Sequence, residues 1–548
     1  MSEQPRSERT IWPFIAAAVV IVIIVAAIRW SLAHPYGIHW DEAEYLNWVG
    51  VDLQRLYSGK VLRLGGRILL GSPGIPTAYR VLALPFLAPF GFHTTAARLS
   101  SLAGFGASCW FIYLATRRVG SEMAGAFAVL IFSLSPEVVS ASMFFGTDAP
   151  LYLATSAMLY YLFLHWSDPS ERPSTWIGLG LAIGLGFWAK ASFFAIALPV
   201  LAFALIVDYR RSPRIQSLVP MAKAGSLGAF LAAPWWLFNA RSALAYAKYS
   251  TDFVRSSLGS PSPATWMRWF STVLQGLLGV SVSILIGLVL VTCLVRFMSR
   301  GTILDALQKA TLGACACAGL PILLAQLSGT NHLLRHITPA VIPLAIAVGV
   351  LVDHAELIRS RAFKAISSAL FCSQLLMIVT PVFYPNHDVV NLGLVNGSLP
   401  WQIMVRFDQW DWRPVRDVSN SCGLEKPKIS YLGNGRAFNP PQIEYPWVAW
   451  VKGTDRYPED VTWLWRYEDG ALDWQKVMDA AEKSDIVLTA PNFVGEVSDK
   501  EDKDNRYNAE FAERLAKDSH FRGPIHLTMG RFEPIDVVVF VKETLVCH

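Results

Sequence analysis

Charged residues are scarce in this chain. Asp, Glu, Lys and Arg make up 16% of its 548 residues, and apolar residues make up 53%. Soluble domains usually carry about 25% charged residues, so the composition excludes an ordinary soluble protein and indicates an integral membrane protein. The net charge of +5 is small for this length, and the absence of a dense basic block argues against nucleic acid as a partner.

Cysteine is also sparse, with seven residues. Five lie in apolar segments and are expected to pack as small hydrophobic side chains: Cys109, Cys293, Cys315, Cys317 and Cys372. Cys315 and Cys317 are close in sequence but lack the His or carboxylate companions that a metal site needs. Cys422 and Cys547 lie in the polar C-terminal region and could form a disulfide if that region is extracytoplasmic.

Long apolar runs are abundant, and a membrane-spanning helix needs about 20 such residues. The first run, 11–28, is longer than the apolar part of a signal peptide and is interpreted as a retained anchor. The Pro-interrupted run 75–91 is expected to lie at the membrane interface. We predict an α-helical polytopic membrane protein with about 11 to 13 transmembrane helices, starting from these candidate spans: 11–33, 97–116, 121–141, 148–166, 175–189, 191–208, 217–239, 270–296, 310–328, 337–353 and 364–384.

Arginines in the short loops suggest an orientation. With eleven crossings and a cytoplasmic N-terminus, the inner loops contain Arg117, Arg118, Arg172, Arg210, Arg211, Arg214, Arg296, Arg300, Arg359 and Arg361. Short basic loops favour the cytoplasm. The outer side then receives the long first loop 34–96, Asp148, Lys190, the segment 329–336 and the C-terminal region.

The chain becomes more polar after the last apolar run. Residues 1–384 are assigned to a transmembrane domain, 385–424 to a linker and 425–548 to a small α/β extracytoplasmic domain. Within that domain the segments 427–434, 484–493 and 535–543 alternate as strands do, whereas 473–484 and 507–519 have helical periodicity.

Three carboxylates follow the first apolar run in the sequence "HWDEAEYL", residues 39–46. Asp41 and Glu42 begin a stretch with helical periodicity, where acidic side chains favour the helix dipole, so a capping role is one interpretation. Asp148 begins a later span and also fits a helix N-terminus. If Asp41 and Asp148 face one cavity, they can provide a catalytic base or hold a divalent cation. The sequence leaves metal use open.

Basic residues are predicted on the same outer side. Lys190 interrupts an apolar region, and an ionisable residue there is a candidate functional residue. His332 and Arg335 precede another span, and Arg63 and Arg67 lie in the first loop. Arginine suits bidentate phosphate binding and lysine provides a point charge. These five residues are therefore candidates for binding an anionic lipid phosphate.

The chain resembles the C-superfamily (GT-C) of membrane glycosyltransferases, which use polyprenyl-phosphate sugars. It is most similar to bacterial relatives of protein O-mannosyltransferases and to lipid A aminoarabinose transferases. The resemblance rests on residues 39–46, 96–120, 146–164, 178–194 and 333–349, in that order. It implies the GT-C fold, Asp41 as the catalytic carboxylate with Glu42 beside it, Asp148 as the acid of a later loop, and Lys190 as the family's lysine.

One motif departs from this resemblance. The aminoarabinose transferases have Glu-Lys-Pro after the first-loop acids, whereas this chain reads "GSPGIPTAY" there. The lysine of that motif has no direct counterpart, and Arg63 or Arg67 is a candidate replacement.

The expected function is transfer of a sugar from a polyprenyl-phosphate donor to a hydroxyl on a lipid, glycan or protein, outside the plasma (inner) membrane. Asp41 would act as the base, and direct displacement would invert the anomeric carbon. A polyprenyl-lipid transporter or flippase is an alternative, although the chain lacks the repeated halves common in transporters. A non-catalytic envelope assembly subunit is a second alternative.

Overall fold

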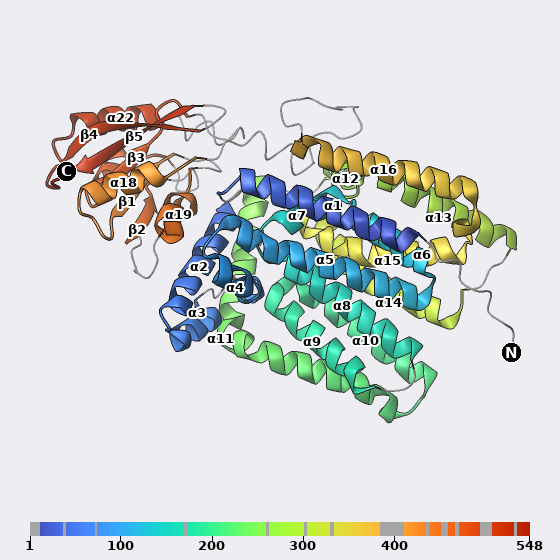
Figure 1. Ribbon diagram of the computed structural model, residues 1–548. Helices are drawn as coiled ribbons and strands as arrows, with labels where there is room; N and C mark the ends of the chain where they lie inside the picture. The colour runs from blue at the N-terminus through green and yellow to red at the C-terminus, as the bar shows by residue number, and fades with distance from the viewer. Residues whose placement is uncertain are drawn as a thin grey trace. The chain divides into compact units, whose positions relative to one another are not determined.

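Helices make up most of the structure, with one small sheet near the C-terminus (Figure 1). The computed structural model divides into two units. Unit 1 contains residues 1–30, 65–82 and 98–403, and unit 2 contains 31–64, 83–97 and 404–548. The structure describes residues 11–36, 40–71, 74–168, 172–258, 262–300, 304–328, 334–383, 410–433, 438–450, 459–465, 471–493, 507–530 and 534–548.

The eleven candidate spans all coincide with helical segments of the structure. Their helices are α1 (Trp12–Ala33), α5 (Thr94–Val119), α6 (Glu122–Ser133), α7 (Pro136–Met143), α8 (Asp148–Ser167), α9 (Pro173–Ala189), α10 (Phe194–Arg211), α11 (Val219–Leu258), α13 (Val280–Arg300), α14 (Ala306–Ser328), α15 (Val341–His354) and α16 (Arg361–Phe383). The prediction of a helical polytopic protein is thereby confirmed. The C-terminal α/β part is confirmed as well.

The number of helices able to cross a membrane is smaller than the number of predicted spans. Among the described residues, six helices are long and apolar enough, and a seventh span is counted if α6 and α7 form one. The remaining predicted spans form helices that are shorter or more polar. The predicted continuous span 121–141 is instead broken between α6 and α7, which bend by 69°. Pro136 begins α7, and proline disfavours continuation of a preceding helix.

The run 75–91 forms a short helix, α4 (Ala78–Phe90), with Pro85 and Pro89 inside it. Its 13 residues correspond to about 20 Å, which is shorter than the hydrocarbon core of about 30 Å. The observed length agrees with the expectation that this run does not span the bilayer.

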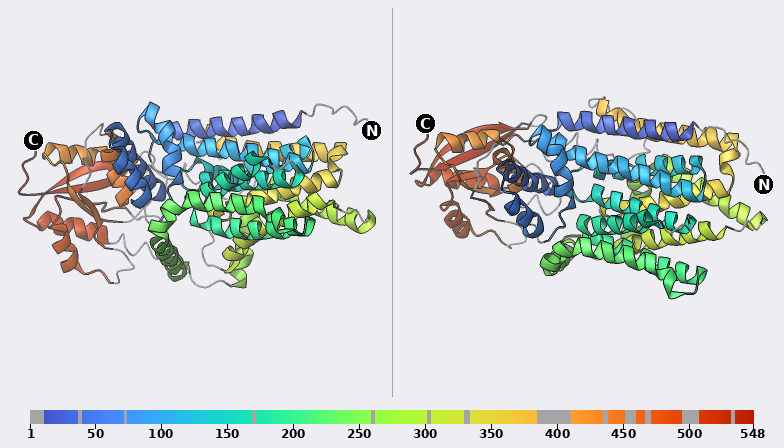
Figure 2. Two further views of the ribbon diagram at one scale, coloured as in Figure 1. Left: turned by 90° about the horizontal axis from the view of Figure 1, so that it is seen from below. Right: turned by 60° about the horizontal axis from the view of Figure 1, so that its bottom comes forward.

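Within unit 1, helices α8 and α9 form an antiparallel hairpin, whereas α9 and α11 run parallel, with Gly180 beside Leu227 and Gly184 beside Leu231. Helix α9 packs against both α8 and α11, and α10 packs against α14; Figures 1 and 2 show these helices side by side. Glycine allows the closest approach, because a Cβ at Gly180 would lie 2.8 Å from Leu227 Cδ2 and 3.0 Å from the Ala224 carbonyl oxygen. Small residues at such contacts are typical of membrane helices.

The sheet in unit 2 has the strand order β2-β1-β3-β5-β4. Strand β1 (Lys428–Leu432) is parallel to β2 (Asp460–Trp463) and β3 (Ile486–Thr489), and β5 (Ile535–Lys542) is antiparallel to β3 and β4 (Phe521–Met529). Its helices are α18 (Arg413–Ser421), α19 (Pro440–Trp450), α20 (Trp474–Ala481) and α22 (Tyr507–Lys517). The three strands and two helices predicted in this region are confirmed; β2, β4, α18 and α19 were not predicted.

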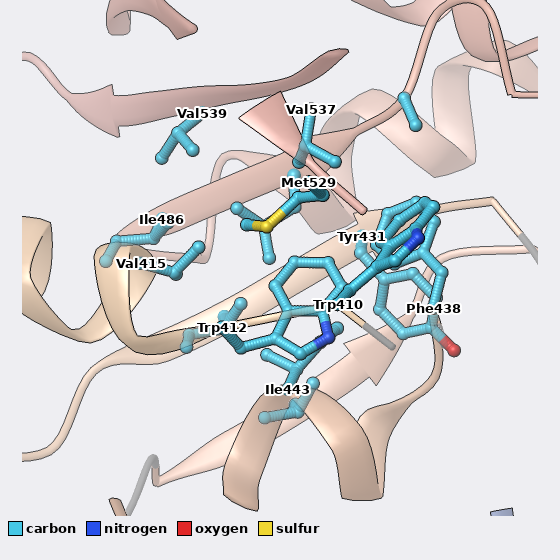
Figure 3. Packing of buried hydrophobic residues seen from close by; sticks show 14 of the residues in the cluster. Trp410, Trp412, Val415, Tyr431, Phe438, Ile443, Ile486, Met529, Val537 and Val539 are labelled. Carbon is cyan, nitrogen blue, oxygen red and sulfur yellow. The ribbon is translucent and has the colours of Figure 1, made fainter. Parts of the chain in front are cut away.

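Aromatic side chains form much of the core on one face of this sheet (Figure 3). Trp410 and Trp412 pack against Phe438, with ring centroids 5.6 Å and 5.3 Å away. The sequence assigned residues 410–424 to the linker, but they contribute these tryptophans and α18 to the core. Cys422, which packs in the same core, forms a disulfide with Cys547, so that pairing is confirmed.

The first-loop helix α2 (Trp40–Tyr57) belongs to unit 2 and packs against α19. Asn47 Nδ2 donates to the Pro441 carbonyl oxygen at 2.9 Å and to Glu444 Oε2 at 3.3 Å. The two helices are so close at Gly50 that a Cβ there would lie 2.2 Å from Val448 Cγ1. The acidic segment after the first apolar run is thus held by the C-terminal region.

Candidate active site

The helical hairpin of α8 and α9 brings Asp148 and Lys190 together in unit 1. Asp148 is the first residue of α8, and Lys190 follows the last residue of α9, so the antiparallel packing places both at the same end. Lys190 Nζ donates to Asp148 Oδ1 at 2.6 Å. The Lys190 side chain is 22% exposed and the Asp148 side chain is 4% exposed. Asp148 therefore forms a buried ion pair.

Residues before α15 add positive charge to this pair. Arg335 lies in the short helix η4 (Leu334–His336), and both Arg335 and His336 act electrostatically on Asp148. The Arg335 guanidinium lies 5.6 Å from the ring centroid of Phe144. The backbone carbonyl oxygen of Arg335 accepts from Thr338 Oγ1 at 2.7 Å.

Two further polar residues complete this group. Tyr152, one turn into α8, is hydrogen-bonded through its hydroxyl to Thr338 Oγ1, which ties α8 to the segment preceding α15. Glu137, in α7, experiences the charges of Arg335 and Asp148. The group thus contains two cations, Lys190 and Arg335, and two acids, Asp148 and Glu137. The acids can orient the two cations toward an anionic ligand.

Asp41 and Glu42 lie in the first turn of α2, in unit 2. Their position near a helix N-terminus agrees with the sequence interpretation, because the helix dipole favours carboxylates there. Glu42 is fully buried and Asp41 is half-buried. Since Asp41 and Asp148 belong to different units, their convergence in one pocket stays a prediction.

Glu44 extends this acidic segment toward the C-terminal region. Burial, followed by the charges of Asp41 and Glu444, raises the pKa of Glu44 to about 7. Burial and Asp460 likewise raise the pKa of Glu444 to about 7, against the opposing effect of the hydrogen bond from Asn47. A carboxyl with a pKa near neutrality is able to exchange protons at physiological pH.

The other predicted basic residues are more dispersed. Arg63 is exposed in α3 (Val61–Leu70), and its carbonyl oxygen accepts from Arg55 Nη1 at 3.5 Å. Arg67 is half-buried, with its carbonyl oxygen accepting from Arg80 Nη1 at 3.4 Å. Arg63 belongs to unit 2 and Arg67 to unit 1. His332 lies outside the described residues.

Sequence reasoning missed several charged residues that lie inside helices. Glu137 is the single acid inside 121–141 apart from Glu122 at its start, and an acid within a predicted span is itself a functional indication. Arg80 and Arg98 are almost completely buried, and the Arg98 guanidinium lies 5.3 Å from the Trp30 ring centroid. Their burial had no distinguishing pattern in the sequence.

The described residues contain one surface group with the spacing of a metal site. Glu482, Asp518 and His520 each offer a ligand atom, and these atoms lie within 4.8 Å of one another. The group does not include Asp41 or Asp148, the pair that the sequence suggested for a divalent cation.

Comparison with known proteins identifies sequences similar to part of this chain. Residues 76–238, which include Asp148 and Lys190, match the family described as dolichyl-phosphate-mannose-protein mannosyltransferase. The chain is 30% identical over 168 residues to an undecaprenyl phosphate-alpha-4-amino-4-deoxy-L-arabinose arabinosyl transferase of Yersinia enterocolitica, covering 30% of this chain and 28% of the relative. A homologous transferase of Pseudomonas fluorescens is 29% identical over 154 residues, covering 27% of this chain and 26% of the relative. The matched stretch thus spans less than a third of either relative.

The fold is similar over a much longer stretch. The crystal structure of ArnT from Cupriavidus metallidurans bound to undecaprenyl phosphate has a TM-score of 0.56 and 13% sequence identity, covering 95% of this chain and 98% of ArnT. The apo form of ArnT gives a TM-score of 0.55. The chain therefore has the fold of ArnT, and part of its sequence is similar to aminoarabinose transferases and to the mannosyltransferase family.

Proposed function

We propose that this protein transfers a sugar from a polyprenyl-phosphate donor, such as an undecaprenyl-phosphate sugar, to a hydroxyl acceptor. The observation that carries the proposal is the buried Asp148–Lys190 pair, which lies inside the stretch that matches the mannosyltransferase family and is accompanied by Arg335. The names of the related transferases support the donor class.

The cationic residues would bind the donor phosphate. Lys190 is held by Asp148, and the Arg335 guanidinium lies over the Phe144 ring. When the bond between the sugar C1 and the phosphate oxygen breaks, negative charge grows on the departing lipid phosphate. Prepositioned cations stabilise such charge without reorganising. Asp148 is thereby a positioning residue, which keeps the Lys190 ammonium oriented.

Asp41 would act as the general base. Its carboxylate takes the proton of the acceptor hydroxyl as that oxygen attacks C1, and the lipid phosphate leaves from the opposite side. One direct displacement inverts the configuration at C1. The neighbouring acids support this assignment, since Glu42 is fully buried and burial raises the pKa of Glu44, so the carboxyl groups of this segment are partly withdrawn from water.

The proposed orientation places the reaction outside the plasma membrane. The disulfide between Cys422 and Cys547 supports an extracytoplasmic C-terminal region, because disulfides persist in oxidising compartments. A cytoplasmic location for the opposite ends of the helices is supported by the arginines in the last turns of α5 and α10, which are Arg117, Arg118, Arg210 and Arg211.

Turnover of a radiolabelled undecaprenyl-phosphate sugar by the purified protein tests this function. Positioned bases contribute about 10²–10⁴-fold to rate, so Asp41→Asn should lower the release of undecaprenyl phosphate by that factor while the protein remains folded. Asp479→Asn, an exposed change in α20, is the matched control. Undiminished turnover of Asp41→Asn would refute the base assignment. Undiminished turnover of the wild type in excess chelator would show that the reaction needs no divalent cation.

A further inference from the structure

A second candidate binding site lies at the other end of the helices of unit 1. A partly open cavity of about 650 Å³ is bounded by the end of α13, the start of α14 and the end of α15. This size is in the range of small-molecule binding sites. Its lining includes Arg296, Lys309, His354 and Glu356 together with apolar side chains.

Helix α15 separates this cavity from the Asp148 group. Thr338 and Arg335 precede Val341 at the beginning of α15, whereas His354 ends it. The 14 residues of the helix correspond to about 20 Å. The cavity is therefore a different site from the one proposed for the sugar donor.

The charge of the cavity favours an anion. Arg296 Nη1 donates to the Ala355 carbonyl oxygen, which fixes the guanidinium but uses only one of its five N–H donors. Lys309 lies exposed in the first turns of α14 and adds a second positive charge. The acid in the lining, Glu356, accepts from Arg359 Nη1 at 2.8 Å. Its charge is thereby offset.

The remaining walls are apolar and continue onto an exposed apolar surface. Leu304 and Leu351 line the cavity. Leu294 and Phe297, also in the lining, are 58% and 63% exposed. Exposed leucine and phenylalanine on a helix apolar enough to span a membrane suit contact with hydrocarbon chains. The cavity thus combines a cationic recess with an apolar exit, as the two parts of an anionic lipid require.

The surrounding helix ends are rich in arginine. Ser121 Oγ donates to Asp353 Oδ1 at 2.6 Å, which places the turn after Arg117 and Arg118 beside the end of α15. Basic short loops favour the cytoplasmic side, and its leaflet carries the anionic lipids that basic pockets between membrane helices bind. We propose that this cavity binds the phosphate headgroup of an anionic phospholipid from the cytoplasmic leaflet. This proposal shares the orientation of the proposed function and none of its catalytic residues.

Native mass spectrometry of the delipidated full chain with added phosphatidylglycerol tests this site. Because one basic residue near an anionic lipid contributes about fivefold to affinity, Lys309→Gln should weaken phosphatidylglycerol binding by about that factor. Lys364→Gln, on the neighbouring α16 and outside the cavity, should have no effect. Equal affinities for wild type and Lys309→Gln, or equal binding of phosphatidylcholine, would overturn the proposal.

Cysteine alkylation provides a second readout that needs no variant. Cys293 lines the cavity, whereas Cys372 is exposed on α16. Phosphatidylglycerol should slow maleimide labelling of Cys293 severalfold and leave Cys372 unchanged, as resolved by peptide mass spectrometry. Protection by inorganic phosphate at the same concentration would identify a soluble anion instead of a lipid and overturn the proposal. Both measurements report binding, so their outcome does not depend on sugar transfer.

Discussion

Lys190→Met is the substitution that most directly tests the ion pair in unit 1. Methionine matches the lysine side chain as far as its fourth atom and removes the ammonium from which Asp148 accepts at 2.6 Å. The Asp148 side chain is only 4% exposed, so its carboxylate would be left buried without its nearest cation.

The expected loss of stability follows from this burial. Removing one partner of a buried ion pair costs about 3–5 kcal/mol, and the remaining charges of Arg335 and His336 favour the lower end, about 3 kcal/mol. Asp148→Asn should cost about 2 kcal/mol, because the Lys190 side chain is 22% exposed and keeps part of its hydration.

A double-mutant cycle distinguishes the pair from two independent effects. The variant carrying both changes buries neither charge, so we expect it to lose about 2 kcal/mol instead of the sum of about 5 kcal/mol, within the range of measured coupling energies for contacting residues. Denaturant unfolding in mixed micelles measures the free energy of unfolding, and release of undecaprenyl phosphate measures turnover. Turnover should stay low in all three variants because each lacks the positioned ammonium.

Two results would refute this reasoning. Additive losses of stability would mean that Asp148 and Lys190 do not interact in the folded protein. Recovery of turnover in the double variant would mean that the pair only stabilises the fold and that Lys190 does not bind the donor phosphate.

Other changes test unit 2, with one control, Gly65→Ala, in unit 1. Gly50→Ala should destabilise the protein by about 1 kcal/mol, because overpacking against α19 costs about 1–3 kcal/mol and outweighs the helical preference of alanine. Gly65→Ala is the control, since its new Cβ would have no atom within 4 Å. It should stabilise the protein by up to about 1 kcal/mol. Equal unfolding midpoints would contradict the close contact. The folded protein holds the proton of Glu44 up to pH about 7, whereas an unfolded glutamate releases it near 4.5. The contribution of Glu44 to stability should therefore be lost as pH rises from about 4.5 to 7, seen as faster hydrogen exchange of residues 40–57, and Glu44→Gln should reduce this dependence; an identical pH profile for the variant would contradict it. Cys422→Ser should cost about 2–4 kcal/mol, measured as faster proteolysis of residues 410–548, and would be contradicted if a reductant left the wild type equally resistant.

Much of the fold was accessible from local patterns. Apolar runs identified segments that are helical in the structure, and alternating residues in 427–434 and 535–543 identified strands β1 and β5. The disulfide was also accessible, because Cys422 and Cys547 are the two cysteines in the polar region. The predicted linker extended too far toward the C-terminus, because residues 410–424 belong to the folded domain. A tryptophan-rich segment has the same composition at a membrane interface and in a core, so composition alone did not reveal this. Trp410 and Trp412 are in a core.

The sequence by itself determined where charges interrupt apolar segments, and so it identified Asp41, Asp148 and Lys190 as candidates. It did not determine their partners, because hydrophobic periodicity specifies which face of an element is buried and says nothing about what covers it. Only the tertiary structure decided that Asp148 pairs with Lys190 across a hairpin, and that Asn47 of the first loop bonds to Glu444, 397 positions away. It also decided that the run 121–141 bends, since packing around Pro136 outweighs the continuity of its apolar sequence.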